Sequence, residues 1–114
     1  MMMVTMTTEM QKCMDDCMAC HRMCMQTMTY CMMMGGKCME GNCMRMLQDC
    51  AMMCQTCNNF MVNGSDMCKE VCGLCAEMCM RCAMECEKCA DDAQMMACAK
   101  MLRECAASCQ MMMA

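Results

Sequence analysis

The chain is poor in the side chains from which most soluble proteins build their cores and binding surfaces. It has no proline, tryptophan or isoleucine, three leucines, three valines, and one residue each of histidine, tyrosine and phenylalanine among 114 residues. The formal net charge is −4, and no basic patch accompanies the two aromatic rings. A nucleic-acid-binding surface is therefore not expected. An ordinary aliphatic core is not expected either.

Long apolar runs and targeting signals are also missing. No uncharged stretch approaches the ~20 apolar residues needed to span a bilayer, so no membrane segment is predicted. The first ten residues, MMMVTMTTEM, lack a basic segment and a cleavage signature, which argues against a secretory signal. Because the cytoplasm keeps thiols reduced, we expect a cytoplasmic protein. The length fits one domain over residues 1–114.

Sulfur takes the place of the missing aliphatic side chains, since the chain contains 20 cysteines and 29 methionines. A run of cysteines alternates in steps of four and three: Cys68, Cys72, Cys75, Cys79, Cys82, Cys86 and Cys89. This spacing places the side chains on one face of an α-helix, in a stripe roughly 32 Å long. Such a stripe normally holds Leu, Ile and Val and faces the core. Thiolates are soft ligands, so the predicted core is itself a candidate metal site.

In the absence of proline, glycines and capping residues must end the helices. Turn signals occur at Gly35–Gly36, at Gly41–Asn42 and over residues 63–66. Ser65 is expected to cap the third helix, and an aspartate at position 91 or 92 is expected to cap the fourth. We predict four helices, over residues 5–33, 38–61, 66–89 and 92–112. Short connections favour antiparallel neighbours. The predicted fold is an all-α, up-down-up-down four-helix bundle with a cysteine-lined core.

Each predicted helix carries one sulfur-rich seam, with Met28, Leu47 and Leu102 expected to fill gaps. Antiparallel packing predicts a first layer of Cys13, Cys57, Cys68 and Cys109, a second of Cys17, Cys54, Cys72 and Cys105, and a third of Cys20, Cys50 and Cys75 with Leu102. The far end should gather Cys31, Cys43, Cys86, Cys89 and Cys98, near Cys38, Met34 and Met95. All twenty cysteines are candidate ligands: the seventeen just named in the layers and at the far end, and also Cys24, Cys79 and Cys82. Cys38 is out of phase and is expected at the mouth of the bundle.

Charge balance predicts how many ions such a core holds. Cu(I) is a soft ion that two or three thiolates satisfy. Two private thiolates per ion would leave a buried anion at every site, which is costly, whereas bridging thiolates allow one Cu(I) per thiolate and a neutral core. We therefore expect on the order of 20 Cu(I) ions per chain, bound with release of thiol protons.

Other interpretations explain less of the pattern. Cysteine as an ordinary core residue does not account for seven consecutive seam positions. Disulfide scaffolds place cysteines in loops, and the iron–sulfur spacing with its proline is absent. Five Cys-x-x-Cys pairs indicate periodicity rather than one activated redox pair. A zinc-binding, metallothionein-like chain competes more strongly, although tetrahedral sites would hold far fewer ions. His21 lies beside the seam and is expected to be a solvated or rim residue.

Several motifs together resemble the four-helix-bundle copper storage proteins, a cysteine-rich bacterial family. They are Cys13-x3-Cys17-x2-Cys20-His21-Arg22-x-Cys24, Gly35-Gly36, Leu47-x-Asp49-Cys50-Ala51-x2-Cys54, Asn59-Phe60-Met61 before Gly64-Ser65, and the Cys72-to-Cys86 run with Cys75-Ala76-Glu77. The resemblance covers nearly the whole chain. It implies a cytosolic or exported Cu(I) store, commonly a homotetramer of bundles, that copper enters at one open end.

The chain departs from this family in two respects. Cys38, Cys43 and Cys68 stand where members often carry histidine, and Cys57 stands where a small residue is common. Methionine is also in excess, mostly as apolar filler. Auxiliary thioether donors are predicted at Met28, Met34, Met61 and Met95.

The sequence thus predicts a non-enzymatic store of many Cu(I) ions. Its expected partners are copper ions and a copper chaperone or chelating acceptor. A general soft-metal buffer or detoxification protein (Zn, Ag or Cd) is the alternative, and a thiol-redox protein is a third hypothesis.

Overall fold

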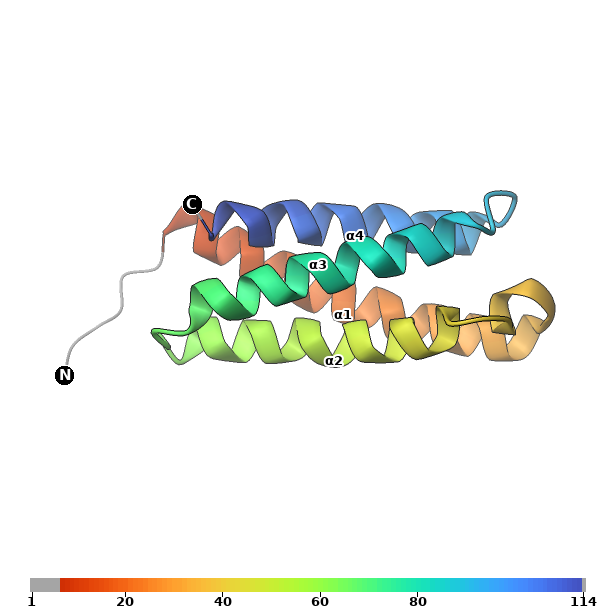
Figure 1. Ribbon diagram of the computed structural model, residues 1–114, viewed down its shortest axis with the longest axis horizontal. Helices are drawn as coiled ribbons and strands as arrows, with labels where there is room; N and C mark the ends of the chain where they lie inside the picture. The colour runs from red at the N-terminus through yellow and green to blue at the C-terminus, as the bar shows by residue number, and fades with distance from the viewer. Residues whose placement is uncertain (1–6, 114) are drawn as a thin grey trace.

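The computed structural model describes residues 7–113, with the side chains of Lys37 and Cys38 left out. Four long α-helices and one short 3₁₀ helix make up these residues: α1 (Thr8–Met34), η1 (Gly36–Met39), α2 (Cys43–Val62), α3 (Cys68–Glu87) and α4 (Ala93–Met111). The helices run up, down, up and down in a bundle of 52 × 22 × 19 Å (Figure 1). α1 packs on α2 and α4, and α3 packs on the same two helices. The predicted four-helix bundle is confirmed.

Helix α1 ends where the Gly35–Gly36 signal places it, but its first residue is Thr8 rather than residue 5. The Thr7 side chain accepts a hydrogen bond from the backbone N–H of Met10 at 3.0 Å and so caps the first turn. The helix ends at Met34, and the Gly35 N–H bonds to the Cys31 carbonyl at 2.8 Å. The predicted start at residue 5 lies outside the described residues.

Helix α2 begins five residues later than predicted. The predicted start, residue 38, belongs to the separate turn η1 instead. Gly41, with φ +65°, then interrupts the chain, because a left-handed backbone cannot continue a right-handed helix. The first residue of α2 is Cys43, with Asn42 before it.

The connection between α2 and α3 is longer than predicted. Gly64, with φ +65°, ends α2, and the Ser65 N–H bonds back to the Phe60 carbonyl at 3.1 Å, as in a Schellman motif. The Ser65 hydroxyl accepts from the Met67 N–H at 3.0 Å, so it supports the turn rather than the helix cap. α3 therefore starts at Cys68 instead of residue 66. The Asp92 prediction is confirmed, since its carboxylate accepts from the Met95 N–H at 3.0 Å.

The core is a column of cysteines with few aliphatic residues. Leu47 and Leu102 are fully buried within it, as predicted, and Ala51, Ala83 and Ala99 lie at its edges. None of the helices in the described part of the chain is both long and apolar enough to cross a membrane. The two ends of the bundle differ. The base holds the α2–α3 connection, and the mouth holds connections 35–42 and 88–92 (Figure 1).

Candidate metal centre

The cysteines line the interior almost without exception. Every described cysteine except Cys68 is buried, and all the described cysteines are free thiols. Cys43 and Cys89 expose 4% and 7% of their surfaces, and the other buried thiols expose none. The predicted inward stripes on all four helices are therefore present.

Sulfur atoms from different helices gather into three groups of four, called the tetrads here. Within each tetrad all four Sγ atoms lie within 4.8 Å of one another. The tetrads are Cys17/Cys75/Cys105/Cys109, Cys54/Cys75/Cys79/Cys105 and Cys20/Cys50/Cys54/Cys79. The middle tetrad shares two thiols with each of its neighbours. The three groups thus form one continuous column of donors rather than three separate sites.

The distances between sulfurs suit shared metal ions. Cys50 and Cys79 are 3.5 Å apart, and Cys54 lies 3.9 Å from Cys79 and 4.0 Å from Cys75. At a metal–sulfur distance of ~2.3 Å, two ligands 120° apart would lie ~4.0 Å from each other. Trigonal coordination by neighbouring thiolates therefore needs little movement. Tetrahedral coordination would fit these distances as well, so the number of ions, rather than the spacing, separates copper from zinc.

Towards the base the thiols pair across neighbouring helices. Cys13 lies 3.6 Å from Cys109, and Cys17 lies 3.8 Å from Cys105, as the predicted layers require. The α2–α3 pairing is different, because Cys57 lies 3.6 Å from Cys72 instead of beside Cys68.

The predicted position of α3 in the layers is thus wrong by one helical turn. The pairs Cys57–Cys72 and Cys50–Cys79 are each centred between residues 64 and 65, within the five-residue connection. Cys50 accordingly meets Cys79 rather than Cys75, and Cys54 meets Cys75 and Cys79 rather than Cys72. Cys68 is partly exposed and donates to the Phe60 carbonyl at 3.3 Å.

Hydrogen bonds between the sulfurs determine which thiols hold their protons. Bonds from Cys20 and other neighbours hold the pKa of Cys50 well below the ordinary thiol value. The pKa of Cys79 is raised, first by its hydrogen bond to Cys105. The bond between Cys20 and Cys105 raises the pKa of Cys20 to about 11. Thiols with a raised pKa, such as Cys20 and Cys79, hold protons that a bound cation must displace.

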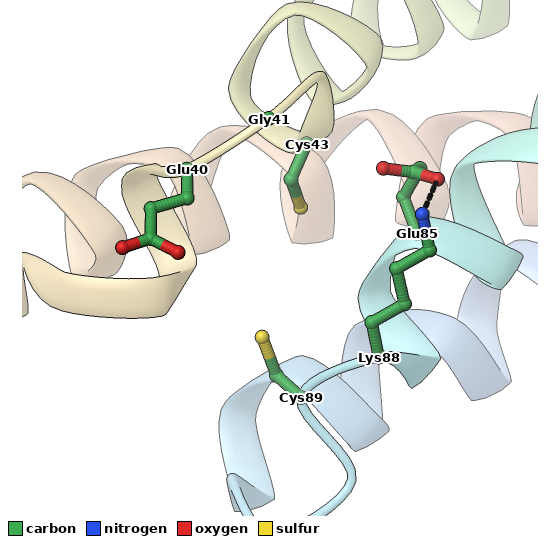
Figure 2. Close-up of a pocket in the computed structure, with 6 residues that line it drawn as sticks. All are labelled: Glu40, Gly41, Cys43, Glu85, Lys88 and Cys89. Carbon is green, nitrogen blue, oxygen red and sulfur yellow. Dashed lines mark ion pairs between the residues drawn. The ribbon is translucent and has the colours of Figure 1, made fainter.

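The mouth contains a cavity of about 390 Å³ lined by Glu40, Gly41, Cys43, Glu85, Lys88 and Cys89. Figure 2 shows the sulfurs of Cys43 and Cys89 pointing towards each other across this space. Glu85 forms an ion pair with Lys88 at 2.6 Å, and the carboxylate of Glu40 lies on the other side of the cavity. Two soft ligands with nearby carboxylates are a suitable first contact for a soft cation.

The family is decided by sequence comparison. Residues 6–114 match the model of the copper storage proteins. The chain belongs to the copper storage protein family. A comparison with curated protein sequences gave no significant match.

Solved structures of the copper storage fold agree closely with this bundle. The chain is 32% identical to the Cu(I)-bound copper storage protein BsCsp3, with TM-score 0.88, covering 94% of this chain and 100% of that one. Apo copper storage protein 3 from Bacillus subtilis is 33% identical, with TM-score 0.85 and coverage of 91% and 98%. A protein from Nitrosospira multiformis is 40% identical, with TM-score 0.85 and coverage of 92% and 94%. The resemblance inferred from the motifs is confirmed, and a family of metal stores agrees with the prediction of a non-enzymatic protein.

The predicted ligands occupy distinct parts of this copper storage core. The tetrads hold Cys17, Cys20, Cys50, Cys54, Cys75, Cys79, Cys105 and Cys109; the base holds Cys13, Cys57 and Cys72; the stretch above the tetrads holds Cys24, Cys82 and Cys98; and the mouth holds Cys31, Cys43, Cys86 and Cys89. Cys68 stands apart at the base, and the side chain of Cys38 lies outside the described residues.

Thr27, rather than Met28, fills the gap between Cys24 and Cys31. Thr27 is fully buried, whereas Met28 is only half-buried on the outer face. Both positions fit steps of three and four, so spacing alone could not choose between them. The Thr27 hydroxyl accepts from the Gln94 side-chain amide at 3.0 Å, and a buried hydroxyl requires such a partner.

The Thr27 hydroxyl also reaches a thiol. It forms a hydrogen bond to Cys98, and the pKa of Cys98 falls to about 4, chiefly through hydrogen bonds from Cys24 and Cys86. Thr27 is a polar core residue that the sequence analysis missed. The signal available was its place three residues after Cys24 and four before Cys31.

The predicted methionine donors divide into two classes. Met95 is fully buried and accepts a hydrogen bond from the Cys31 thiol at 3.6 Å, which supports its prediction as a donor at the mouth. Met61 is buried at the base. Met34 exposes 65% of its surface. Met28 packs against the core but also lines an outer groove, so neither methionine is buried among the thiols. His21 is a rim residue, as predicted, with its Nδ1 2.7 Å from the Ala51 carbonyl.

Proposed function

We propose that this protein stores Cu(I) in its interior, at about one ion per cysteine and so on the order of 20 ions per chain. All twenty cysteines take part in this proposal, and residues 1–114 act as one storage domain. Its closest support is a likeness to a Cu(I)-bound copper storage protein at 32% identity.

One observation carries the stoichiometry: the tetrads share thiols. Cys54 and Cys79 belong to two tetrads, as do Cys75 and Cys105. A thiolate that bridges two ions contributes to the charge balance of both. A fully buried column of this kind reaches neutrality only when ions and thiolates are equal in number, and uncompensated buried charge is strongly unfavourable.

Anaerobic titration with Cu(I) against a competing chelator tests the proposal. Storage predicts a plateau near the thiol count of 20 per chain, with full protection of the thiols from a thiol reagent. Saturation at about one quarter of that count would instead identify a buffer for zinc or other four-coordinate ions. A protein that binds no metal while its thiols remain reactive would contradict both and favour thiol-redox chemistry. Parallel titrations with Zn(II) and Ag(I) measure the preference directly.

Copper passes through the mouth in this proposal. Cys43 and Cys89 are nearly buried but line an open cavity. Lys88 balances Glu85 there, and the carboxylate of Glu40 leaves the lining net negative. At the base, the only thiol with substantial exposure among the described cysteines is Cys68, which donates to a backbone carbonyl.

Stopped-flow measurement of copper loading distinguishes uptake through the mouth from uptake through the base. C43S/C89S is expected to slow copper uptake while removing at most about two ions of capacity. C68S is the matched control at the opposite end and is expected to leave the rate unchanged. Equal slowing by both variants would place uptake elsewhere.

The assembly and the cellular setting extend the same proposal. A homotetramer is supported by exposed methionines at the end of α1, where Met33 exposes 80% of its surface and Met34 65%. The free thiols support a cytoplasmic location. A copper chaperone or chelating acceptor would receive the ions. Light scattering of apo and loaded protein measures the oligomer, and transfer to a chelating acceptor measures release.

A further inference from the structure

A groove on the outside of the bundle lies between α1 and α2, well apart from the mouth cavity. Its volume is about 710 Å³, and its walls carry His21, Met25 and Met28 from α1 and Met44 and Met52 from α2. On α1 these residues follow each other in steps of four and three, so they share one helical face. On α2, Met44, Gln48 and Met52 line the groove in steps of four. Two antiparallel rows of thioethers therefore flank the only histidine of the chain.

The histidine is held in the orientation that a metal ligand requires. Its Nδ1 lies 2.7 Å from the Ala51 carbonyl oxygen. A carbonyl only accepts, so Nδ1 carries the proton and Nε2 presents its lone pair. Metal-binding histidines are commonly oriented by such a bond from the second ring nitrogen to a backbone carbonyl. Among the described side chains, no buried nitrogen or oxygen lacks a partner. Nε2, which has no hydrogen bond, is therefore open to the groove.

The thioethers are exposed enough to act as ligands. Met25 exposes 48% of its surface and Met52 62%. Met25 lies one turn from His21 on the same helix, and Met52 follows Ala51, whose carbonyl holds the ring. Three rotatable bonds in each methionine allow its sulfur to reach an ion at Nε2.

The donor atoms and charges of the groove favour a soft monovalent cation. No carboxylate lines it, and its one charged side chain is Arg45. Hard divalent cations prefer oxygen ligands and would be repelled more strongly by a guanidinium than a monovalent ion would. Imidazole nitrogen and thioether sulfur are neutral donors that suit Cu(I) and the related Ag(I).

We infer that His21 Nε2, with the sulfurs of Met25 and Met52, binds one Cu(I) ion on the outer surface, separately from the core thiols. This site lies outside the proposed storage core. Because its ligands are neutral, the site carries the ion's positive charge in a solvated groove. It is therefore weaker than the thiolate sites and fills after them.

The single histidine makes the test direct. The protein is loaded anaerobically with Cu(I) until its thiols no longer react, and NMR signals of the His21 ring are then followed during addition of up to three further equivalents. The proposal predicts a saturable shift of these signals with one further ion. In M25L/M52L, which preserves the histidine and the apolar bulk, the affinity should fall by on the order of tenfold or more. M84L/M111L, which replaces two equally exposed methionines elsewhere, is the matched control and should behave as the parent.

Other outcomes would overturn the proposal. One is a ring signal that stays constant, and another is a shift that survives in M25L/M52L or weakens equally in the M84L/M111L control. Signals that change with protein concentration rather than copper would identify the groove as a contact between copies. Thiol protection is recorded in the same samples and reports on the storage proposal independently. If the thiols fail to fill, Cu(I) bound in the groove still shifts the His21 signals of the parent and not those of M25L/M52L.

Discussion

The tetrads and the mouth contain similar ligands but arrange them differently. In the tetrads, sulfurs from different helices lie within 4.8 Å of one another and share members. At the mouth, the described thiols form no such group: Cys31 contacts the Met95 thioether, and Cys43 and Cys89 face a cavity. Dense sharing favours a large neutral cluster, whereas open spacing favours one- or two-thiolate contacts that exchange ions. We therefore expect the tetrads to retain Cu(I) ions and the mouth to transfer them.

The largest expected effect comes from removing equal numbers of thiols from the two regions. One variant replaces Cys20, Cys50, Cys54 and Cys79 by serine, and the matched variant replaces Cys31, Cys43, Cys86 and Cys89. The tetrad variant is expected to lose more than four Cu(I) ions, because Cys54 and Cys79 also serve the neighbouring tetrad. The mouth variant is expected to lose about four or fewer.

Metal analysis after anaerobic loading and gel filtration measures both capacities, and circular dichroism controls for folding. Equal losses from the two folded variants would abolish the distinction between holding and transfer. A larger loss from the mouth variant would reverse it.

The pH dependence sharpens the same comparison. In the tetrad of Cys20, Cys50, Cys54 and Cys79, hydrogen bonding raises the pKa of every thiol except Cys50. Those thiols are protonated at neutral pH and must release protons to Cu(I), so affinity falls as pH falls, by about tenfold per pH unit for each proton released. At the mouth, the hydrogen bond between Cys43 and Cys86 lowers the pKa of Cys43 and raises that of Cys86. These two thiols therefore release about one proton between them, fewer per thiol than the tetrad.

Competition with a chelator between pH 8 and pH 6 checks this expectation. The tetrad variant should show the weaker pH dependence per bound ion, and the mouth variant the stronger. If affinity changes equally with pH in the two variants, the number of protons released per bound ion does not differ between the tetrad and the mouth.

Most of the architecture was predictable from the sequence because the 3–4 spacing of cysteine determines which face of each helix is buried. The pairs Cys13–Cys109 and Cys17–Cys105 followed from that spacing and from antiparallel packing. The position of α3 did not follow, because it depends on the length of a turn controlled by the left-handed Gly64. An error of a few residues there moves every thiol of α3 by one turn.

The choice between Thr27 and Met28 also required tertiary information. Methionine is the better match to an apolar seam, but the seam contains Thr27 because Gln94, distant in sequence, satisfies its hydroxyl. The mouth cavity and the outer groove arise from packing between helices. The mouth cavity had no periodic signal. The groove residues of α1 follow helical steps, but the steps do not show which residues of α2 they face.

A smaller effect is expected from the aliphatic residue within the seam. Leu102 is fully buried where the third predicted layer lacks a thiol. L102A should destabilise the apo protein by about 2–5 kcal/mol through lost burial and a cavity, with copper capacity unchanged. L102C restores part of the volume and adds a ligand, so it should raise capacity by about one ion. Denaturant unfolding and metal analysis measure the two quantities. A variant L102C with unchanged capacity would show that seam position alone does not create a site.

The smallest expected effect concerns the connection at the mouth. The Tyr30 hydroxyl donates to the Asp92 carboxylate at 2.6 Å, and this bond, followed by that from the Met95 N–H, lowers the pKa of Asp92. A lowered pKa stabilises the fold above the ordinary carboxyl value and loses that contribution as pH falls through the folded-state value. Y30F should therefore lower the apo Tm at pH 7 by at most about 5 °C and make less difference at pH 3. Because the bond lies at the mouth, copper capacity should stay the same while hydrogen exchange near residues 88–92 accelerates. An equal acceleration in the tetrads would show that the two regions open together rather than independently.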